Sequence, residues 1–318
     1  MVGPDQHRRG VRAMDGNGTD MSFHFKKSDK TAQAAVRRVA LSQIDAALSE
    51  IDGKELTPEQ IVHQVRKRCK KLRALIRLVR PGLADYAREN AAFRDLARML
   101  SGVRDQDVLI HSCDRIGQHF GKDADADIMY ALCARLATDK EERTAGGPDR
   151  LADFRNGMVQ ARERAQMWVI EGDGFAAFAG GLCQGLKRAR DAMAHARHDA
   201  VPDAMHEWRK HVKYHAYQAR LFREIWPEMM QVHTTALSDL ADLLGEHHDM
   251  AVLQQRLAER PHDYGGAEAV RHICGLSHEL QENIADASFR SGARLLAERP
   301  RALAARWESY WQLWRGED

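Results

Sequence analysis

Residues 63–80, which read HQVRKRCKKLRALIRLVR, constrain the fold more than any other part of the chain. Eight of these eighteen residues are Lys or Arg, and none is Asp or Glu. Apolar residues recur at steps of three and four, as on one face of a helix: Val65, Cys69, Leu72, Ile76 and Val79. A basic stripe follows the same period: His63, Arg66, Lys67, Lys70, Arg73 and Arg77. The segment therefore predicts an amphipathic helix with a buried face and a basic face.

The charge on this basic face needs a partner. Like charges at helical spacing cost about 0.2–0.5 kcal/mol per neighbouring pair, and residues 61–84 contain no acidic residue to offset them. The whole chain has 48 basic and 46 acidic residues, so its net charge is only +2. The basic face is thus a local segregation of charge. Acidic neighbours in the fold, or an anion from outside, must neutralise it.

Helical periodicity also runs through most of the remaining chain. Thr57, Pro58 and Gln60 have the spacing of an N-cap, a first-turn proline and a capping box, so the basic helix is expected to start there. Later in the chain, Gly245 is expected to end one helix, and the next is expected to begin at His247. The other predicted helices cover about residues 28–51, 83–100, 125–143, 150–170, 175–198, 202–226, 266–287 and 289–315, with one more opening at 104. No alternating run bounded by turn dipeptides supports a sheet. The predicted fold class is all-α.

The expected domain organisation is a disordered tail and two halves of one domain. Residues 1–27 are rich in Gly, Asp, Arg and His without an apolar period, which is typical of a disordered tail. The stretch TAGGPD at residues 144–149 marks the boundary between halves. Residues 28–145 are expected to form the first helical bundle half and residues 146–318 the second.

Cysteine spacing and hydropathy predict the cellular setting. The five cysteines lie far apart and form no C-x-x-C pair, which favours reduced thiols in the cytosol. No apolar run approaches the roughly 18–20 residues that a membrane span needs, and the N-terminus lacks the apolar block of a secretory signal. We therefore expect a soluble, cytoplasmic protein that does not associate with a membrane.

The basic helix has a second copy later in the chain. Laying His206 on His63 gives seven identities without a gap. The repeated residues are His206, Arg209, Lys210, Lys213, Arg220, Leu221 and Arg223. After one inserted residue the match resumes, with Asp249 on Asp105 and His248 where Arg104 stands. Duplicated units of this kind predict approximate two-fold pseudo-symmetry, so the two basic helices are expected to be equivalent parts of one anion-binding site.

Taken together, these residues resemble the CHAD family, the conserved histidine α-helical domain. The resemblance covers about residues 28–315 and rests on the two H-x-x-R-K-x-x-K motifs beginning at His63 and His206, on the RDQDV stretch at residues 104–108, and on Arg294, Arg301 and Arg306. It implies two helical bundles related by pseudo-two-fold symmetry, with a basic central groove or pore that binds inorganic polyphosphate. Many members also carry a triphosphate-tunnel domain with an E-x-E-x-K signature. This chain shows no such signature, so that domain's catalytic activity is not carried over.

The expected function is therefore binding of inorganic polyphosphate, without catalysis or a cofactor, in the cytoplasm and at polyphosphate granules. Other polyanions are allowed for as partners, and the oligomeric state stays open. The expected polyphosphate-binding residues are Arg37, Arg38, His63, Arg66, Lys67, Lys70, Arg73, Arg77, Arg104, Lys187, Arg190, His206, Arg209, Lys210, Lys213, Tyr217, Arg220, His248, Arg294 and Arg301. Since His248 stands where the first copy has arginine, its contact is expected to be weaker or dependent on pH.

Two other functions are compatible with a basic site. Nucleic-acid binding would use aromatic side chains for base stacking, but the first basic face has none and the second offers only Tyr214 and Tyr217. A metal-dependent phosphohydrolase would draw on His63, His206, His247, His248, Asp105 and Asp249. However, the chain has no H-E-x-x-H motif, and residues 247–249 are consecutive and would leave a helix in different directions. We therefore assign no metal ligand and no catalytic residue.

Overall fold

The computed structural model describes residues 23–100, 105–121, 125–143, 148–199 and 201–316. This part of the chain is built from helices and contains no strand, only a lone bridge between Leu83 and Ile170. The helices are α1 (Ala32–Asp52), α2 (Pro58–Leu78), α3 (Tyr86–Met99), α4 (Asp105–Phe120), α5 (Ala126–Arg143), α6 (Pro148–Gln166), α7 (Ala176–His198), α8 (Pro202–Leu221), α9 (Pro227–Glu259), α10 (Gly266–Leu295) and α11 (Pro300–Arg315), with short 3-10 turns η2 (Arg80–Gly82) and η4 (Pro261–Tyr264). The prediction of an all-α fold is confirmed. Within the described ranges, no helix has the length and apolar character that crossing a membrane requires.

Helix α2 forms as its sequence predicts. The Thr57 hydroxyl accepts a hydrogen bond from the Gln60 backbone N–H at 3.3 Å, and the Gln60 side chain accepts one from the Thr57 N–H at 2.9 Å. This capping box satisfies two donors that the first turn would otherwise leave unpaired. The apolar stripe of α2, from Val65 to Val79, is fully buried. The basic stripe is consequently turned away from the core.

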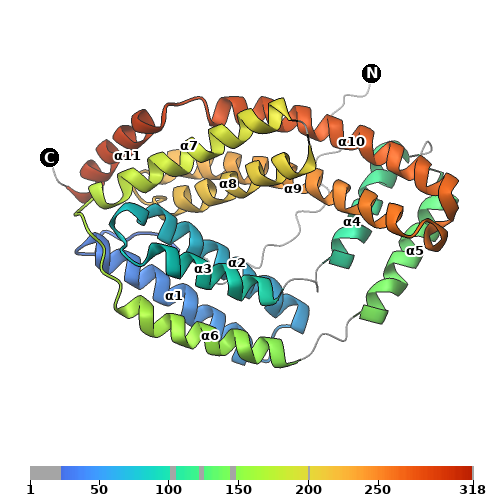
Figure 1. The fold of residues 1–318 in the computed structure, drawn as a ribbon. Coiled ribbons are helices and arrows are strands. Elements are labelled where there is room, and N and C mark those ends of the chain that lie inside the picture. The colour runs from blue at the N-terminus through green and yellow to red at the C-terminus, as the bar shows by residue number, and fades with distance from the viewer. Residues whose placement is uncertain (1–22, 101–104, 122–124, 144–147, 200, 317–318) are drawn as a thin grey trace, which may run out of the picture.

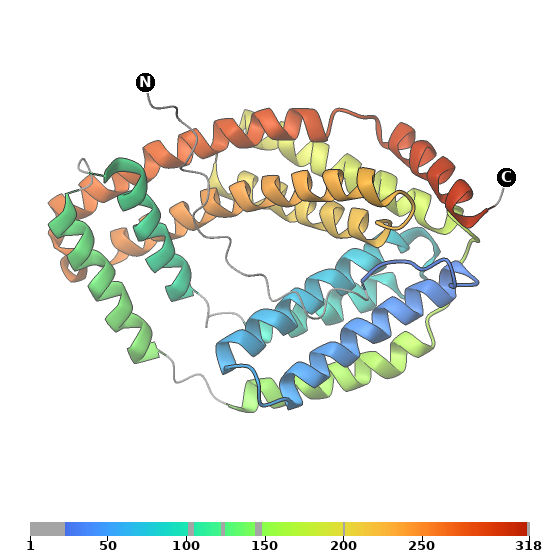
Figure 2. The same ribbon diagram turned by 180° about the vertical axis from the view of Figure 1, so that it is seen from behind.

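The described helices pack in three groups (Figures 1 and 2). The first contains α1, α2, α3 and α6, with α1 in contact with both α2 and α6. The second contains α7, α8, α11 and the start of α9, and α2 joins it to the first group by packing against α7 and α8. The third contains α4, α5, α10 and the end of α9. One apolar core runs through the first two groups, and a separate core fills the third.

This packing differs from the expected halves at residues 28–145 and 146–318. Helix α6 follows the boundary in sequence but packs against α1 and α3, whereas α4 and α5 precede it and pack with α9 and α10. The reason is that each amphipathic helix buries its apolar stripe against whichever face complements it. Leu109 and Ile116 of α4, for example, are buried in one cluster with Leu253 of α9. The chain therefore leaves the first group at α4 and returns to it at α6. The two-fold relation of the halves stays a prediction.

Gly245 does not end a helix, contrary to the sequence interpretation. Helix α9 continues through it from Pro227 to Glu259. A glycine inside a helix costs about 1 kcal/mol relative to alanine, but Leu244 and Met250 on either side are fully buried, and their burial outweighs that cost. In the repeat alignment, α9 therefore covers in one helix what α3 and α4 cover in two.

The predicted disordered tail, residues 1–27, extends too far toward α1, because its last residues pack against the folded domain. Phe23 and Phe25 are buried in the core, and the Phe25 ring stacks on Phe178 with 4.6 Å between centroids. The Phe25 backbone N–H donates to the Leu221 carbonyl at 2.8 Å, at the end of α8. These two phenylalanines anchor the segment in the core. No sign of this burial comes from the polar residues around them in the sequence. The rest of the expected tail, residues 1–22, lies outside the described residues.

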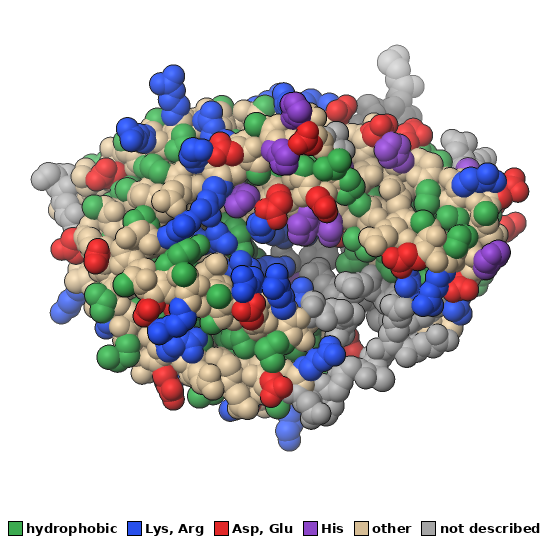
Figure 3. Space-filling model, in the orientation of Figure 1, with side chains coloured by type: hydrophobic (Ala, Val, Ile, Leu, Met, Phe, Trp, Pro, Cys, Tyr) green, Lys and Arg blue, Asp and Glu red, His purple; other side chains and the backbone are tan. Residues whose placement is uncertain are grey.

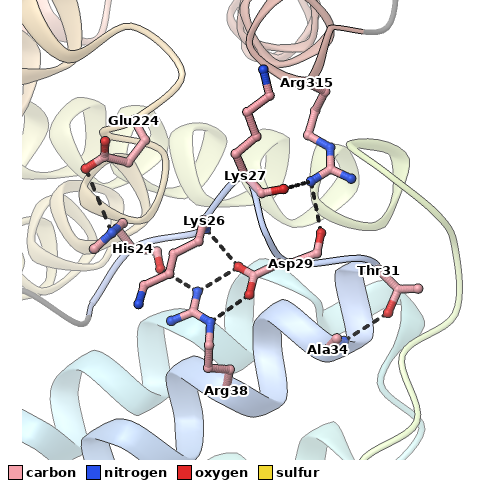
Figure 4. A network of polar contacts seen from close by, with 9 residues as sticks. All are labelled: His24, Lys26, Lys27, Asp29, Thr31, Ala34, Arg38, Glu224 and Arg315. Carbon is pink, nitrogen blue, oxygen red and sulfur yellow. Dashed lines mark hydrogen bonds and ion pairs between the residues drawn. The ribbon is translucent and has the colours of Figure 1, made fainter.

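Polar contacts hold the segment that precedes α1 (Figure 4). Arg38 donates two hydrogen bonds to the Asp29 carboxylate, each 2.7 Å long, in the paired geometry that favours arginine. Arg315, at the end of α11, donates to the carbonyl oxygens of Lys27 at 2.8 Å and Asp29 at 2.9 Å. The segment thus ties α1 to the C-terminal helix.

Candidate anion-binding site

A cavity of about 430 Å³ lies between α2, α8 and α9, with His111 of α4 at its side. Figure 3 shows a hollow near the middle of the molecule, with Lys and Arg side chains along one side and acidic and His side chains along its upper edge. The cavity is lined by His63, Arg66, Lys67, Lys70, His111, Arg209, Lys213, Ala216, Tyr217, Arg220, Thr234, Ser238, Ala241, Asp242, Gly245, Glu246 and Asp249. Two of its walls are therefore the two basic helices, and α9 forms the third.

Eight of the expected site residues meet in this cavity: His63, Arg66, Lys67, Lys70, Arg209, Lys213, Tyr217 and Arg220. They come from α2 and α8, which pack directly against each other. Two repeat-related pairs, Arg66 with Arg209 and Lys70 with Lys213, line the same space. The two basic helices therefore face one cavity.

Neighbouring elements position these cations. Arg66 Nη1 donates to the Ala97 carbonyl at 3.0 Å, near the end of α3. Lys213 Nζ lies 3.8 Å from Asp242 Oδ1 of α9. Because these partners are on different helices, the positions of the cations depend on the packing of α2, α8 and their neighbours.

The wall formed by α9 carries acidic side chains, of which the sequence pattern had singled out only Asp249. Asp242, Glu246 and Asp249 all line the cavity. Their spacing of four and three residues places them on one face of a helix, and this spacing is the signal that could have found them. Burial raises the pKa of the Glu246 carboxyl, although Arg115 of α4 bonds to it. The cavity thus has two basic walls and one acidic wall.

A second, smaller basic crevice of about 20 Å³ lies at the far end of α2. Arg77, Arg80, Arg188 and His211 line it together with Tyr214, and none of its described lining residues is acidic. The Arg77 guanidinium lies over the Tyr214 ring, with Cζ 4.4 Å from the centroid. Burial and the nearby Lys210 charge lower the pKa of His211 to about 4. Arg77 therefore faces this crevice, whereas its repeat partner Arg220 faces the large cavity.

Internal partners neutralise part of the charge of α2. Arg68 is buried and donates to Glu50 at 2.7 Å and to Gln43 at 2.8 Å, both on α1. Lys71 is also buried, with Nζ 5.3 Å from the Phe23 centroid. Neither residue belongs to the basic stripe predicted from the sequence. The fold thus supplies an acidic neighbour for Arg68, while the stripe itself turns toward the cavity and the crevice.

Several expected site residues form contacts elsewhere in the fold. Arg37 Nε donates to the Trp168 carbonyl at 2.7 Å, and Arg38 is bonded to Asp29. Arg73 donates to Asn90 at 3.2 Å. These side chains connect α1 and α2 to neighbouring segments and do not line the cavity. Their basic character alone could not distinguish these contacts from anion binding.

The remaining expected residues of the second half also lie away from the cavity lining. Lys187 pairs with Asp191 at 2.5 Å, and Lys210 pairs with Glu207. Arg190 Nη1 donates to the carbonyls of residues 297 and 298, and Arg294 and Arg301 are exposed on α10 and α11. Arg104 lies outside the described residues.

His206 and His248 lie side by side, with 4.3 Å between ring centroids. Burial lowers the pKa of His206, and the charge of Arg209 adds to this effect. Burial is the main cause that lowers the pKa of His248 to about 4, and the nearby His206 and Arg209 lower it further. Both rings are therefore neutral near pH 7, and neither lines the cavity. The expected pH-dependent contact of His248 stays a prediction.

The described residues include no group of three or more His, Cys, Asp or Glu that could hold a metal ion. The side chain of Asp105, one of the ligands considered for a phosphohydrolase, lies outside the described residues. That alternative therefore stays untested.

Comparisons with known proteins agree with this architecture. The family model of the CHAD domain matches residues 35–258, which include every residue lining the cavity. The fold is similar to the crystal structure of the CHAD domain from the plant Ricinus communis, with a TM-score of 0.58 and 20% sequence identity over 88% of this chain and 91% of that chain. The search of curated proteins returned no match. Because the family match covers most of the chain and the fold agrees with it, this chain belongs to the CHAD domain family.

Proposed function

We propose that this chain binds inorganic polyphosphate in the cavity between α2, α8 and α9. The observation that carries this proposal is the convergence of Arg66 and Lys70 with their repeat partners Arg209 and Lys213 on one cavity. Some members of the CHAD domain family bind polyphosphate, which supports the same assignment. The role is binding and not catalysis, and it fits a cytoplasmic protein associated with polyphosphate granules.

Polyphosphate matches the chemistry of the two basic walls. Its charges are closely spaced and it has no bases, so it requires many cationic donors in a row. Arg66 and Arg209 would each hold phosphate oxygens with two parallel N–H bonds, while Lys70 and Lys213 would act as point charges. The carboxylates of α9 repel the polyanion, so the phosphate chain would lie against α2 and α8.

Nucleic-acid binding is less well supported by the geometry of the aromatic residues. Tyr214 is 6% exposed, and the guanidinium groups of Arg73 and Arg77 lie over its ring. Tyr217 lines the cavity but packs edge-on against Phe23, with 6.1 Å between centroids. These two tyrosine rings of the second basic helix therefore offer little surface for base stacking. In a competition assay at equal phosphate concentration, polyphosphate should displace RNA, and the reverse order would favour the nucleic-acid function.

Charge reversal within the cavity tests the proposed function. The double variant K70E/K213E should bind polyphosphate at least tenfold more weakly, because each lost charged hydrogen bond is worth about 1.5–3 kcal/mol and about 1.4 kcal/mol corresponds to a factor of ten. The matched control R271E/R290E changes the charge equally at exposed positions of α10 outside the cavity. It should alter the affinity less than about twofold. Equal affinities of the two variants, both folded by circular dichroism, would place the binding site elsewhere.

Salt dependence tests the electrostatic mechanism. If binding releases counterions, the logarithm of the affinity should fall linearly with the logarithm of salt concentration, by about 0.7–0.9 for each phosphate neutralised. Isothermal titration calorimetry from low to physiological ionic strength gives the slope, and a flat line would contradict ionic binding.

A further inference from the structure

Two cysteines that are far apart in sequence lie next to each other in the fold. Cys113 of α4 and Cys133 of α5 are separated by 20 residues, and their Sγ atoms are 2.7 Å apart. A disulfide bond is about 2.05 Å long, so only a small movement separates the two thiols from a bond. The sequence pattern, which contains no closely spaced cysteine pair, does not reveal this contact.

The two thiols differ in environment. Cys113 is fully buried in the core of the third helix group, whereas Cys133 is half-buried at its edge. The contact between the two sulfurs lowers the pKa of Cys133, and the same contact together with burial raises the pKa of Cys113. Asp114 Oδ1, 3.8 Å from the Cys133 Sγ, opposes ionisation of Cys133. Cys133 is therefore the thiol that forms a thiolate first and meets a reagent from solvent.

We propose that Cys113 and Cys133 form a reversible disulfide by exchange with a small-molecule disulfide of the glutathione type. The Cys133 thiolate attacks one sulfur of glutathione disulfide, which forms a mixed disulfide and releases one glutathione thiolate. Cys113 then loses its proton and attacks the Cys133 Sγ, which releases the second glutathione. The chain loses two thiol protons and two electrons, and glutathione disulfide is reduced to two glutathione molecules.

The disulfide would cross-link α4 and α5 beside the anion-binding cavity. Helix α4 contributes His111 to the cavity lining, and its Arg115 bonds to Glu246 on the acidic wall. A covalent link that closes a loop restricts the unfolded chain and stabilises the folded one. The oxidised protein should therefore hold α4 to α5 and unfold less readily than the reduced protein.

Mapping of the thiols in the full chain tests this proposal. The protein is incubated with glutathione disulfide, unfolded in N-ethylmaleimide and digested for mass spectrometry. We expect a cross-linked peptide containing Cys113 and Cys133, with Cys69, Cys183 and Cys274 alkylated. A chain that keeps both thiols alkylated, or stops at a glutathione adduct on Cys133, would overturn the proposal.

Serine variants test the order of the two steps. C113S should accumulate glutathione on Cys133, because the resolving thiol is missing, while C133S should leave Cys113 reduced. C183S, which removes a half-buried cysteine of α7, is the matched control and should form the cross-link as the wild type does. The oxidised wild type should also melt at a higher temperature than its reduced form, and C133S should show no such difference. A glutathione adduct on Cys113 in C133S would contradict the assigned order.

Discussion

The guanidinium of Arg209 on α8 packs against Gly245 on α9. A Cβ atom added at Gly245 would lie 3.0 Å from Arg209 Nη2 and 3.1 Å from its Nε. Real Cβ atoms rarely approach other atoms so closely, so a larger residue would have to displace the arginine. The glycine that the sequence pattern assigned to a helix end thus makes room for a cation of the anion-binding cavity.

Replacing Gly245 with alanine should weaken polyphosphate binding without destabilising the fold. The added methyl group displaces the Arg209 guanidinium, while alanine raises helix propensity by about 1 kcal/mol. We expect a severalfold loss of affinity and an unchanged or higher melting temperature. G275A is the matched control, because a Cβ at Gly275 of α10 meets nothing within 4 Å. Equal affinities of G245A and G275A would show that the position of Arg209 does not matter for binding.

Removing the negative charge of Asp242 should strengthen polyphosphate binding. Asp242 lies on the acidic wall, 3.8 Å from Lys213, and its side chain is 71% exposed. D242N removes repulsion toward the polyanion and releases Lys213 from its ion pair. Surface pairs of this kind are worth about 0.2–1 kcal/mol, so the affinity should rise by up to about fivefold. D239N changes an exposed residue of the same helix that does not line the cavity and should leave the affinity unchanged. A weaker D242N complex would indicate that the carboxylate assists binding.

The second basic crevice predicts a dependence on chain length. Lys70 and Arg77 are seven residues apart on α2, which corresponds to about 10 Å along the helix, and they belong to the cavity and the crevice, respectively. A long polyphosphate held in the cavity could continue along α2 to Arg188. R188A should therefore weaken binding of long chains severalfold and leave tripolyphosphate binding unchanged. K187A, on the neighbouring exposed position of α7, should affect neither ligand. An equal loss for both lengths in R188A would contradict this path.

The stability of the fold should fall as pH is lowered from about 6.5 toward 4. His215 is fully buried, its ring stacks on Trp307 with 6.2 Å between centroids, and burial lowers its pKa to about 3. Below the ordinary pKa of 6.5, the unfolded chain binds a proton that folded His215 does not bind. Stability is therefore complete above pH 6.5 and falls by about 1.4 kcal/mol per pH unit from this residue.

Urea unfolding of H215F across this range measures the contribution of His215. The variant should retain a ring against Trp307. The slope of its unfolding free energy against pH should correspond to about one proton fewer taken up on unfolding than in the wild type. H272Q replaces an exposed histidine of α10 and should keep the wild-type slope. If H215F also kept that slope, His215 would not be held neutral in the folded chain.

Local features of the fold could be predicted from the sequence because they depend on residues close together in the chain. The steps of three and four between Val65 and Val79 predicted the buried face of α2, and Thr57 with Gln60 predicted its start. The same periodicity predicted an all-α fold. Local patterns failed where distant contacts outweigh them, as at Gly245 inside α9 and at Phe23 in the core.

The sequence by itself determined that this chain is helical, that it carries two basic helices and that they repeat, because helix period and charge spacing are properties of the chain alone. The tertiary structure decided which charges meet. Arg66 and Arg209 reach one cavity because α2 packs against α8, while Arg68 of the same helix is buried against Glu50. The structure also placed Asp242 opposite Lys213, and Cys113 beside Cys133. Helical period specifies the face on which a residue lies, but the partner of that face depends on long-range packing of apolar surfaces, which no local pattern contains.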